Sequence, residues 1–69
     1  MAQRVKGVVR VFDGSKGYGY IQAQGLDVFV HYSAIASAGL QNLREGEQVE
    51  FTLEESFRGP QAAQVIRLN

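Results

Sequence analysis

The chain has no cysteine and no tryptophan, and only one proline and one histidine among its 69 residues. Without cysteine, the fold cannot rely on disulfides or on thiolate ligation of a metal. With only one histidine, His31 is not expected to ligate a metal either, so we expect no metal and no cofactor. The absence of cysteine also means that nothing in the chain points to an oxidising compartment.

Long apolar runs are also missing. No segment approaches the roughly 18 consecutive apolar residues of a membrane-spanning helix, and residues 1–7 lack the apolar run of a signal peptide. We therefore expect a cytoplasmic protein without membrane association. Net charge is zero, with seven Lys and Arg against seven Asp and Glu, which excludes a strong overall attraction to polyanions. Four basic residues between Arg4 and Lys16 and five glutamates between residues 45 and 55 predict one basic and one acidic side.

What is present is a single domain, 1–69, made of short strands. Residues 5–13 are rich in β-branched side chains, and simple alternation puts Val11 on the same face as Val5 and Val9, unless Gly7 marks a bulge. Residues 47–55 alternate, with Val49, Phe51 and Leu53 inward and Thr52 outward. A turn at 56–60 leads to a last strand at 62–68, whose buried face the pattern does not decide. The connection 33–46 has no strand periodicity; Ser33 is expected to cap one short helical turn, and Ile35 and Leu43 to be buried.

Residues 16–32 carry the strongest functional pattern, K-G-Y-G-Y-I-Q-A-Q-G-L-D-V-F-V-H-Y. Alternation along an extended strand from Lys16 places it on one face with two tyrosines, and a turn at 24–26 returns the chain as a second strand with Val28 and Val30 inward. Four rings then share the outer side: Tyr18, Tyr20, Phe29 and His31. Unpaired nucleic-acid bases stack on such rings at about 1–3 kcal/mol per base.

Each of these residues also has an interpretation without a ligand. The rings could serve only as a cross-strand cluster worth about 0.2–1 kcal/mol per pair, although the glycines between the tyrosines favour stacking. Lys16 and Arg10 are either phosphate contacts or solvated charges, and Phe12 either stacks on a base or packs at the core edge. Phe57 is either an additional ligand contact or an incidental exposed ring. Arg58 contacts the ligand or belongs to its turn.

Two motifs bring in a family resemblance: K-G-Y-G-Y-I (16–21) and V-F-V-H-Y (28–32) resemble the two ribonucleoprotein motifs of the bacterial cold-shock domain. The resemblance extends over nearly the whole chain, through G-V-V-R-V-F-D, L-R-E-G-E-Q-V-E-F and R-G-P-Q-A-A-Q-V. RNA recognition motifs share the first pattern, but there the second motif comes tens of residues earlier and two helices pack behind the sheet. The resemblance implies an all-β fold, a five-stranded antiparallel Greek-key barrel of the oligonucleotide/oligosaccharide-binding (OB) type.

The resemblance also implies binding of single-stranded RNA and DNA with low sequence preference, and action as an RNA chaperone. Transferred by position, the stacking residues are Tyr18, Tyr20, Phe29, His31 and Tyr32, with Phe12 at the edge and Lys16 and Arg10 as basic positions. The family usually has Trp where this chain has Val11, often Phe at Leu40, Asn at Asp13 and a polar residue at Phe57. Loss of two rings predicts weaker binding, by one or more orders of magnitude.

These observations predict a non-enzymatic protein, because the sequence has no nucleophile paired with a base, no metal cluster and no phosphate-binding glycine loop that opens a helix. We expect it to bind single-stranded nucleic acid, to keep RNA unpaired and so to influence transcription or translation. The main alternative is an OB-fold protein-interaction module in which nucleic-acid binding has weakened. A monomer is expected, with a dimer or a strand swap left open.

Overall fold

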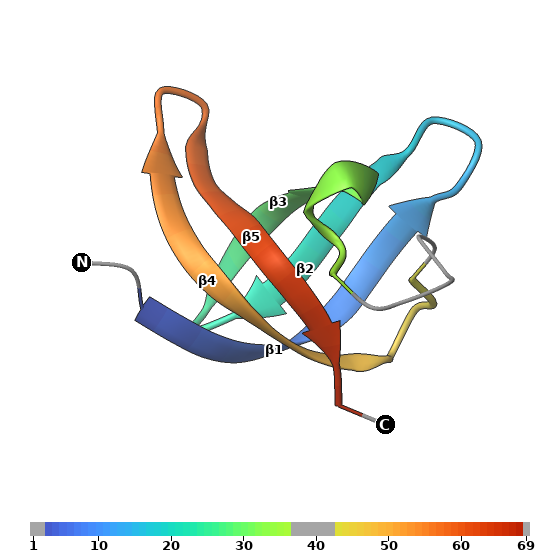
Figure 1. The fold of residues 1–69 in the computed structure, drawn as a ribbon, viewed down its shortest axis with the longest axis horizontal. Helices are drawn as coiled ribbons and strands as arrows, with labels where there is room; N and C mark the ends of the chain where they lie inside the picture. The colour runs from blue at the N-terminus through green and yellow to red at the C-terminus, as the bar shows by residue number, and fades with distance from the viewer. Residues whose placement is uncertain (1–2, 37–42, 69) are drawn as a thin grey trace.

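The structure, a computed structural model, describes residues 3–36 and 43–68. It comprises strands β1 (Gln3–Asp13), β2 (Tyr18–Ala23) and β3 (Leu26–His31), a 3₁₀ turn η1 (Tyr32–Ala34), and strands β4 (Gln48–Ser56) and β5 (Gly59–Arg67). The strands close into a barrel in the order β1-β2-β3-β5-β4 (Figure 1). All pairs are antiparallel except β3 and β5, which run parallel and meet at Phe29 and Gln61. The predicted five-stranded barrel is confirmed, with one parallel contact added. Among the described residues, no helix is long and apolar enough to cross a membrane.

A bulge in β1 changes which side chains point outward. Val5 and Val9 are buried, but the pairing with β2 shifts by one residue between Val9 and Val11. The extra residue, Arg10, reverses the alternation that follows it. Val11 is therefore 42% exposed, and Phe12 is partly buried against the core. The prediction that Val11 shares the inner face with Val5 and Val9 is wrong, because the bulge lies three residues beyond the suspected Gly7.

The β2–β3 hairpin has a shorter turn than the pattern predicted. Gln24 and Gly25 both have positive φ, 53° and 75°, as a two-residue type I′ hairpin requires. Leu26 already belongs to β3, opposite Ala23. The predicted turn at 24–26 is thus one residue too long, yet the register it sets puts Val28 and Val30 in the core as expected.

A similar correction applies to the β4–β5 hairpin. Only Phe57 and Arg58 form its turn, while Ser56 pairs with Gly59 and Pro60 is already part of β5. Farther along β5, the register shifts opposite Glu50 and Thr52, where Gln64 has a φ of 51°. This bulge makes the strand switch phase, so its buried residues are Ala62 and Val65. Neither of the two alternating faces read from the sequence is the buried one.

The core fills the barrel interior with small and β-branched residues around Phe51, which is fully buried. Ile35 and Leu43 close it from the long connection, as predicted. Thr52, predicted to face solvent, is only 5% exposed. Its Oγ1 accepts a hydrogen bond of 3.1 Å from Arg4 Nη1, which also donates to the carbonyl of Gln64 at 2.8 Å. One guanidinium thus links β1, β4 and β5 at the bulge.

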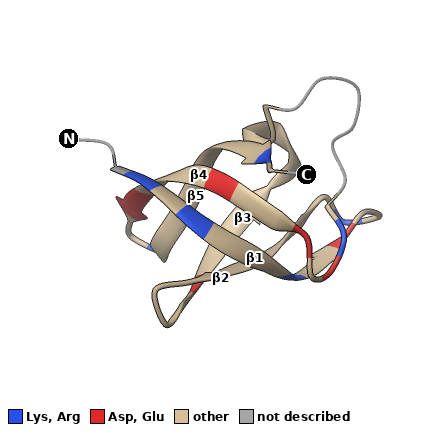
Figure 2. Cartoon of the chain, turned by 90° about the horizontal axis from the view of Figure 1, so that it is seen from below, with Lys and Arg blue, Asp and Glu red and all other residues tan. Residues whose placement is uncertain are grey.

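Charges of both signs mix on the β1–β4 surface. Lys6 lies opposite Glu50 in the ladder, and Figure 2 shows basic β1 positions beside an acidic position of β4. Glu50 also lies 3.7 Å from Arg4, and Glu47 lies 3.1 Å from Arg67. The prediction of one basic and one acidic side is wrong here, because the first half of β1 pairs with the glutamate-rich strand.

Candidate nucleic-acid interface

The β2–β3 hairpin presents a row of rings on the outside of the barrel. In the ladder Tyr18 pairs with His31 and Tyr20 with Phe29, so side chains that alternate along each strand also meet across the strands. Tyr18 and Tyr20 are 38% and 40% exposed, whereas Phe29 and His31 are partly buried between their neighbours. We call these four residues, together with Tyr32, the aromatic platform.

Phe29 lies at the centre of the platform. Its ring centroid is 5.8 Å from that of Tyr18, tilted by 32°, and 5.9 Å from that of Tyr20, in an edge-on arrangement of 73°. Aromatic pairs in this range stabilise each other by about 0.5–1.5 kcal/mol beyond burial. The rings therefore support one another, and their exposed faces remain available to a ligand.

Gly19 of β2 and Gly17, in the turn before β2, allow this arrangement. A Cβ on Gly19 would lie 2.2 Å from the carbonyl oxygen of Val11 and 2.6 Å from the Cα of Phe12. Gly17 has a φ of +80°, and a Cβ there would lie 2.8 Å from the Tyr32 ring. The alternation of glycine and tyrosine therefore lets β1 approach β2 closely and leaves room for Tyr32.

Tyr32 joins the platform because strand geometry stops at His31. If β3 continued, alternation would place Tyr32 on the opposite face of the sheet. Instead η1 begins at Tyr32, and the Tyr32 ring centroid lies 4.5 Å from that of His31. His31 also caps η1: its Nδ1 accepts a 3.2 Å hydrogen bond from the backbone N–H of Ser33 and lies 2.9 Å from Ser33 Oγ. The prediction that Ser33 caps this turn is wrong, since His31 takes that role.

The two residues beside the platform on β1 differ in environment. Val11 lies opposite Tyr20 in the register, and Phe12 opposite Gly19. Val11 is exposed, whereas Phe12 packs partly against the core. The position at which the family resemblance expects Trp thus borders the platform directly, and a small aliphatic side chain occupies it. Leu40, the other expected loss of a ring, lies outside the described residues.

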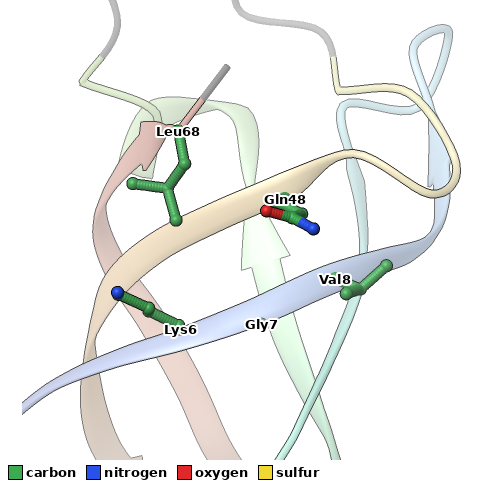
Figure 3. Close-up of a pocket in the computed structure, with 5 residues that line it drawn as sticks. All are labelled: Lys6, Gly7, Val8, Gln48 and Leu68. Carbon is green, nitrogen blue, oxygen red and sulfur yellow. The ribbon is translucent and has the colours of Figure 1, made fainter.

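A hollow adjoins the platform where β2, β3 and the start of β5 meet. It has a volume of about 180 Å³ and is lined by Tyr20, Phe29, Asp27, Arg58 and Pro60. Two rings, a carboxylate and a guanidinium thus surround a space open to solvent. A second hollow, on the β1–β4 side, is lined by Lys6, Gly7, Val8, Gln48 and Leu68 and has no ring in its lining (Figure 3). Only the first hollow offers aromatic surface.

Two of the basic candidates are held in different ways. Arg10 Nη1 lies 2.6 Å from Asp27 Oδ2, and both side chains are largely exposed. Lys16 lies in the turn before β2, not on the strand as predicted, because the positive φ of Gly17 interrupts the extended chain. The Lys16 side chain is exposed, two residues before Tyr18, the platform residue at which β2 begins.

Asp13 organises that turn. Its Oδ1 accepts hydrogen bonds from Ser15 Oγ at 2.7 Å, from Ser15 N at 3.0 Å and from Lys16 N at 3.3 Å. The Ser15 hydroxyl bond, assisted by the two backbone bonds, lowers the pKa of the Asp13 carboxyl below its usual value. Asp13 thus fixes the loop that carries Lys16. An asparagine oxygen would accept the same bonds without the charge.

Phe57 and Arg58 form the tip of the β4–β5 hairpin. The Phe57 ring is 96% exposed, and the Arg58 guanidinium carbon lies 5.7 Å from its centroid. Arg58 also lines the hollow with Tyr20 and Phe29. The described residues contain no group of three or more His, Cys, Asp or Glu side chains suited to a metal ion.

Comparison with known proteins identifies the family to which this arrangement belongs. The 'Cold-shock' DNA-binding domain family model matches residues 5–68. The chain belongs to the cold-shock domain family. It is 47% identical over 70 residues to the cold shock-like protein CspA of Vibrio cholerae, covering 99% of this chain and all of the relative. It is 51% identical over 65 residues to the major cold shock protein CspA of Bacillus cereus, covering 93% and 97% of the two chains.

A solved structure supports the cold-shock fold independently of close sequence similarity. The barrel superposes on part of a chain described as Drosophila Unr CSD456 with a TM-score of 0.81, at 19% identity. The match covers 97% of this chain and 27% of that one. At this identity, the likeness establishes the cold-shock barrel alone.

The structure brings most of the predicted site residues to one side of the cold-shock barrel. Tyr18 and Tyr20 both contact the Phe29 ring, and His31 contacts Tyr32. Arg58 lines the hollow with Tyr20 and Phe29. Two residues that sequence reasoning did not select also belong to this surface, Asp27 and Pro60. Alternation places Asp27 on the face of Phe29, which was a usable signal. Pro60 comes close only through the parallel meeting of β3 and β5, which local pattern does not reveal.

Proposed function

We propose that this cold-shock domain, a single domain over residues 1–69, binds single-stranded RNA and DNA. Bases stack on the aromatic platform, while Lys16 and Arg10 contact phosphates and Phe12 borders the path. Phe57 and Arg58 extend the surface beyond the hollow. The observation that carries the proposal is the row of mutually supported, solvent-exposed rings on β2–β3, on a chain whose family model is that of a DNA-binding domain.

Low sequence specificity follows from the chemistry of such a surface. Every base has a π face, so stacking tolerates all of them at about 1–3 kcal/mol per base. Specific recognition would need many donors and acceptors directed at base edges, and few polar side-chain groups line the platform's hollow: those of Asp27 and Arg58 and the Tyr20 hydroxyl. The protein therefore binds open strands in general.

Binding an open strand in preference to a duplex makes the protein an RNA chaperone. Duplex bases stack on one another and cannot also stack on the platform, so the protein has differential affinity for the unpaired state. It shifts RNA toward unpaired conformations by mass action, without an energy source and without catalysis. We propose that it acts as a monomer in the cytoplasm and influences transcription or translation of the RNAs that it opens.

Tyrosine fluorescence tests this proposal directly. The chain has three tyrosines and no tryptophan, and Tyr18, Tyr20 and Tyr32 all belong to the platform, so the whole emission reports on it. Titration with oligothymidylate at micromolar protein and low salt is expected to quench this emission. Absence of quenching, with the protein folded by circular dichroism, would favour the alternative of a protein-interaction module on the same barrel.

A further inference from the structure

Phe57 is the most exposed of the large hydrophobic side chains in the described residues, at 96%. Single exposed apolar residues are common and require no explanation by themselves. The surroundings of Phe57, however, distinguish it from the other exposed apolar residues. Its ring gains almost no burial from folding, yet the backbone that carries it is fixed.

Ser56 fixes the turn below the ring. Its hydroxyl donates to the carbonyl of Gly59 at 2.8 Å and accepts from the backbone N–H of Arg58 at 3.2 Å. Gly59, with a φ of 105°, then returns the chain into β5. A side chain on an ordered turn loses less conformational freedom on binding than one on a loose loop.

Arg58 connects this ring with the platform. Its guanidinium carbon lies 5.7 Å from the Phe57 centroid, and its side chain also lines the hollow that contains Tyr20 and Phe29. A ring, a cation and two further rings therefore follow one another from the hairpin tip to the hollow. A nucleotide strand offers the same order, because a phosphate separates each base from the next.

We propose that Phe57 forms an additional base-stacking subsite at one end of the nucleic-acid path. A base in the hollow contacts Tyr20 and Phe29, the next phosphate lies beside Arg58, and the following base stacks on Phe57. Strands long enough to reach the hairpin tip thus bind more tightly than strands that occupy the platform alone. The inference rests on the proposed function and adds to it the length of strand that the protein prefers.

The test pairs substitution of the protein with removal of bases. Affinities of the wild type and of Phe57→Ala are measured for an oligothymidylate of about ten nucleotides and for a series in which each position in turn is abasic. Loss of one stacking contact corresponds to a decrease of about fivefold or more in affinity. At one terminal position of the strand, the abasic change and Phe57→Ala are expected to have non-additive effects, because both remove the same contact.

Ile66→Ala is the matched control, since Ile66 is also an exposed apolar residue, but it belongs to β5 and lies at the end of that strand away from the turn. It is expected to leave affinity unchanged. If Phe57→Ala lowered the affinity by the same factor for every abasic strand, or for none of the strands, the proposal of a Phe57 subsite would be disproved. Those outcomes, with the intact strand still bound by the wild type, leave the proposed function intact; lack of binding of the intact strand by the folded wild type would instead contradict the proposed function itself.

Discussion

The substitution Val11→Trp tests the position of the platform and the reason for its expected weakness. The bulge at Arg10 turns Val11 outward, opposite Tyr20 in the ladder. An indole at this position would extend the row of rings by one. If instead β1 alternated without a bulge, the same indole would enter a core that already contains Phe51.

The two geometries predict different magnitudes. On the surface, an added ring supplies one more stacking contact, about 1–3 kcal/mol, which corresponds to an affinity increase of about fivefold to about 150-fold. Because Val11 is already 42% exposed, we expect little change in the free energy of unfolding. Forced into a packed core, a larger side chain would cost about 1–3 kcal/mol or more in that free energy.

Fluorescence titration with oligothymidylate and thermal unfolding by circular dichroism measure the two quantities on the same sample. Val8→Trp is the control, since Val8 is on the same strand and is also 42% exposed, but it lines the hollow without rings. Only Val11→Trp is expected to tighten binding. A folded Val11→Trp protein with unchanged or weaker affinity would refute the proposal that this position borders the nucleic-acid path.

Three further predictions concern the existing platform and its support. Phe29→Ala is expected to weaken oligonucleotide binding by about tenfold or more in a protein that stays folded, because it removes the central ring of the platform; equal affinities in a fluorescence titration would contradict the stacking role. The plot of log affinity against log salt is expected to be shallow, since Asp27 already neutralises Arg10 at 2.6 Å; a slope that corresponds to more than about four phosphates would point to another surface. Gly19→Ala is expected to destabilise the barrel by about 1–3 kcal/mol or more, because its Cβ would meet the Val11 carbonyl at 2.2 Å. Gly25→Ala, whose added atom meets nothing within 4 Å, measures the cost of a positive φ alone; a Gly19→Ala denaturant midpoint equal to that of the wild type would disprove the close packing of β1 on β2.

The sequence predicts the platform well because its information is local. In β2 and β3, odd and even sequence positions point to opposite faces of the sheet, and the short hairpin between the strands fixes which residues lie opposite one another. The ring row and the buried Val28 and Val30 follow from this alternation. The barrel class follows instead from the short strands along the whole chain and from the family resemblance. The family resemblance adds Tyr32, whose position depends on a change from strand to 3₁₀ turn that parity alone would misplace.

The errors fall where the chain departs from strict alternation. One extra residue at Arg10 turns Val11 outward, and another near Gln64 moves burial to Ala62 and Val65. A bulge adds one residue to a strand and has no distinctive sequence. The inward or outward direction predicted by alternation is therefore wrong for the residues beyond the bulge. Pro60 was missed because the hollow forms only when β3 meets β5, two strands that the sequence separates by the long connection. Alternation alone already placed Asp27 on the face of Phe29.

The bulge in β1 also explains how a chain with no net charge can present a binding surface. It places Arg10 against Asp27 and Val11 beside Tyr20, so the edge of the platform is electrically balanced and partly apolar. A surface of this kind attracts nucleic acid weakly at long range and holds it by contact between rings and bases. Stacking requires bases that are not paired. A surface that relies on stacking and has little net charge therefore binds the unpaired strand in preference to the more highly charged duplex.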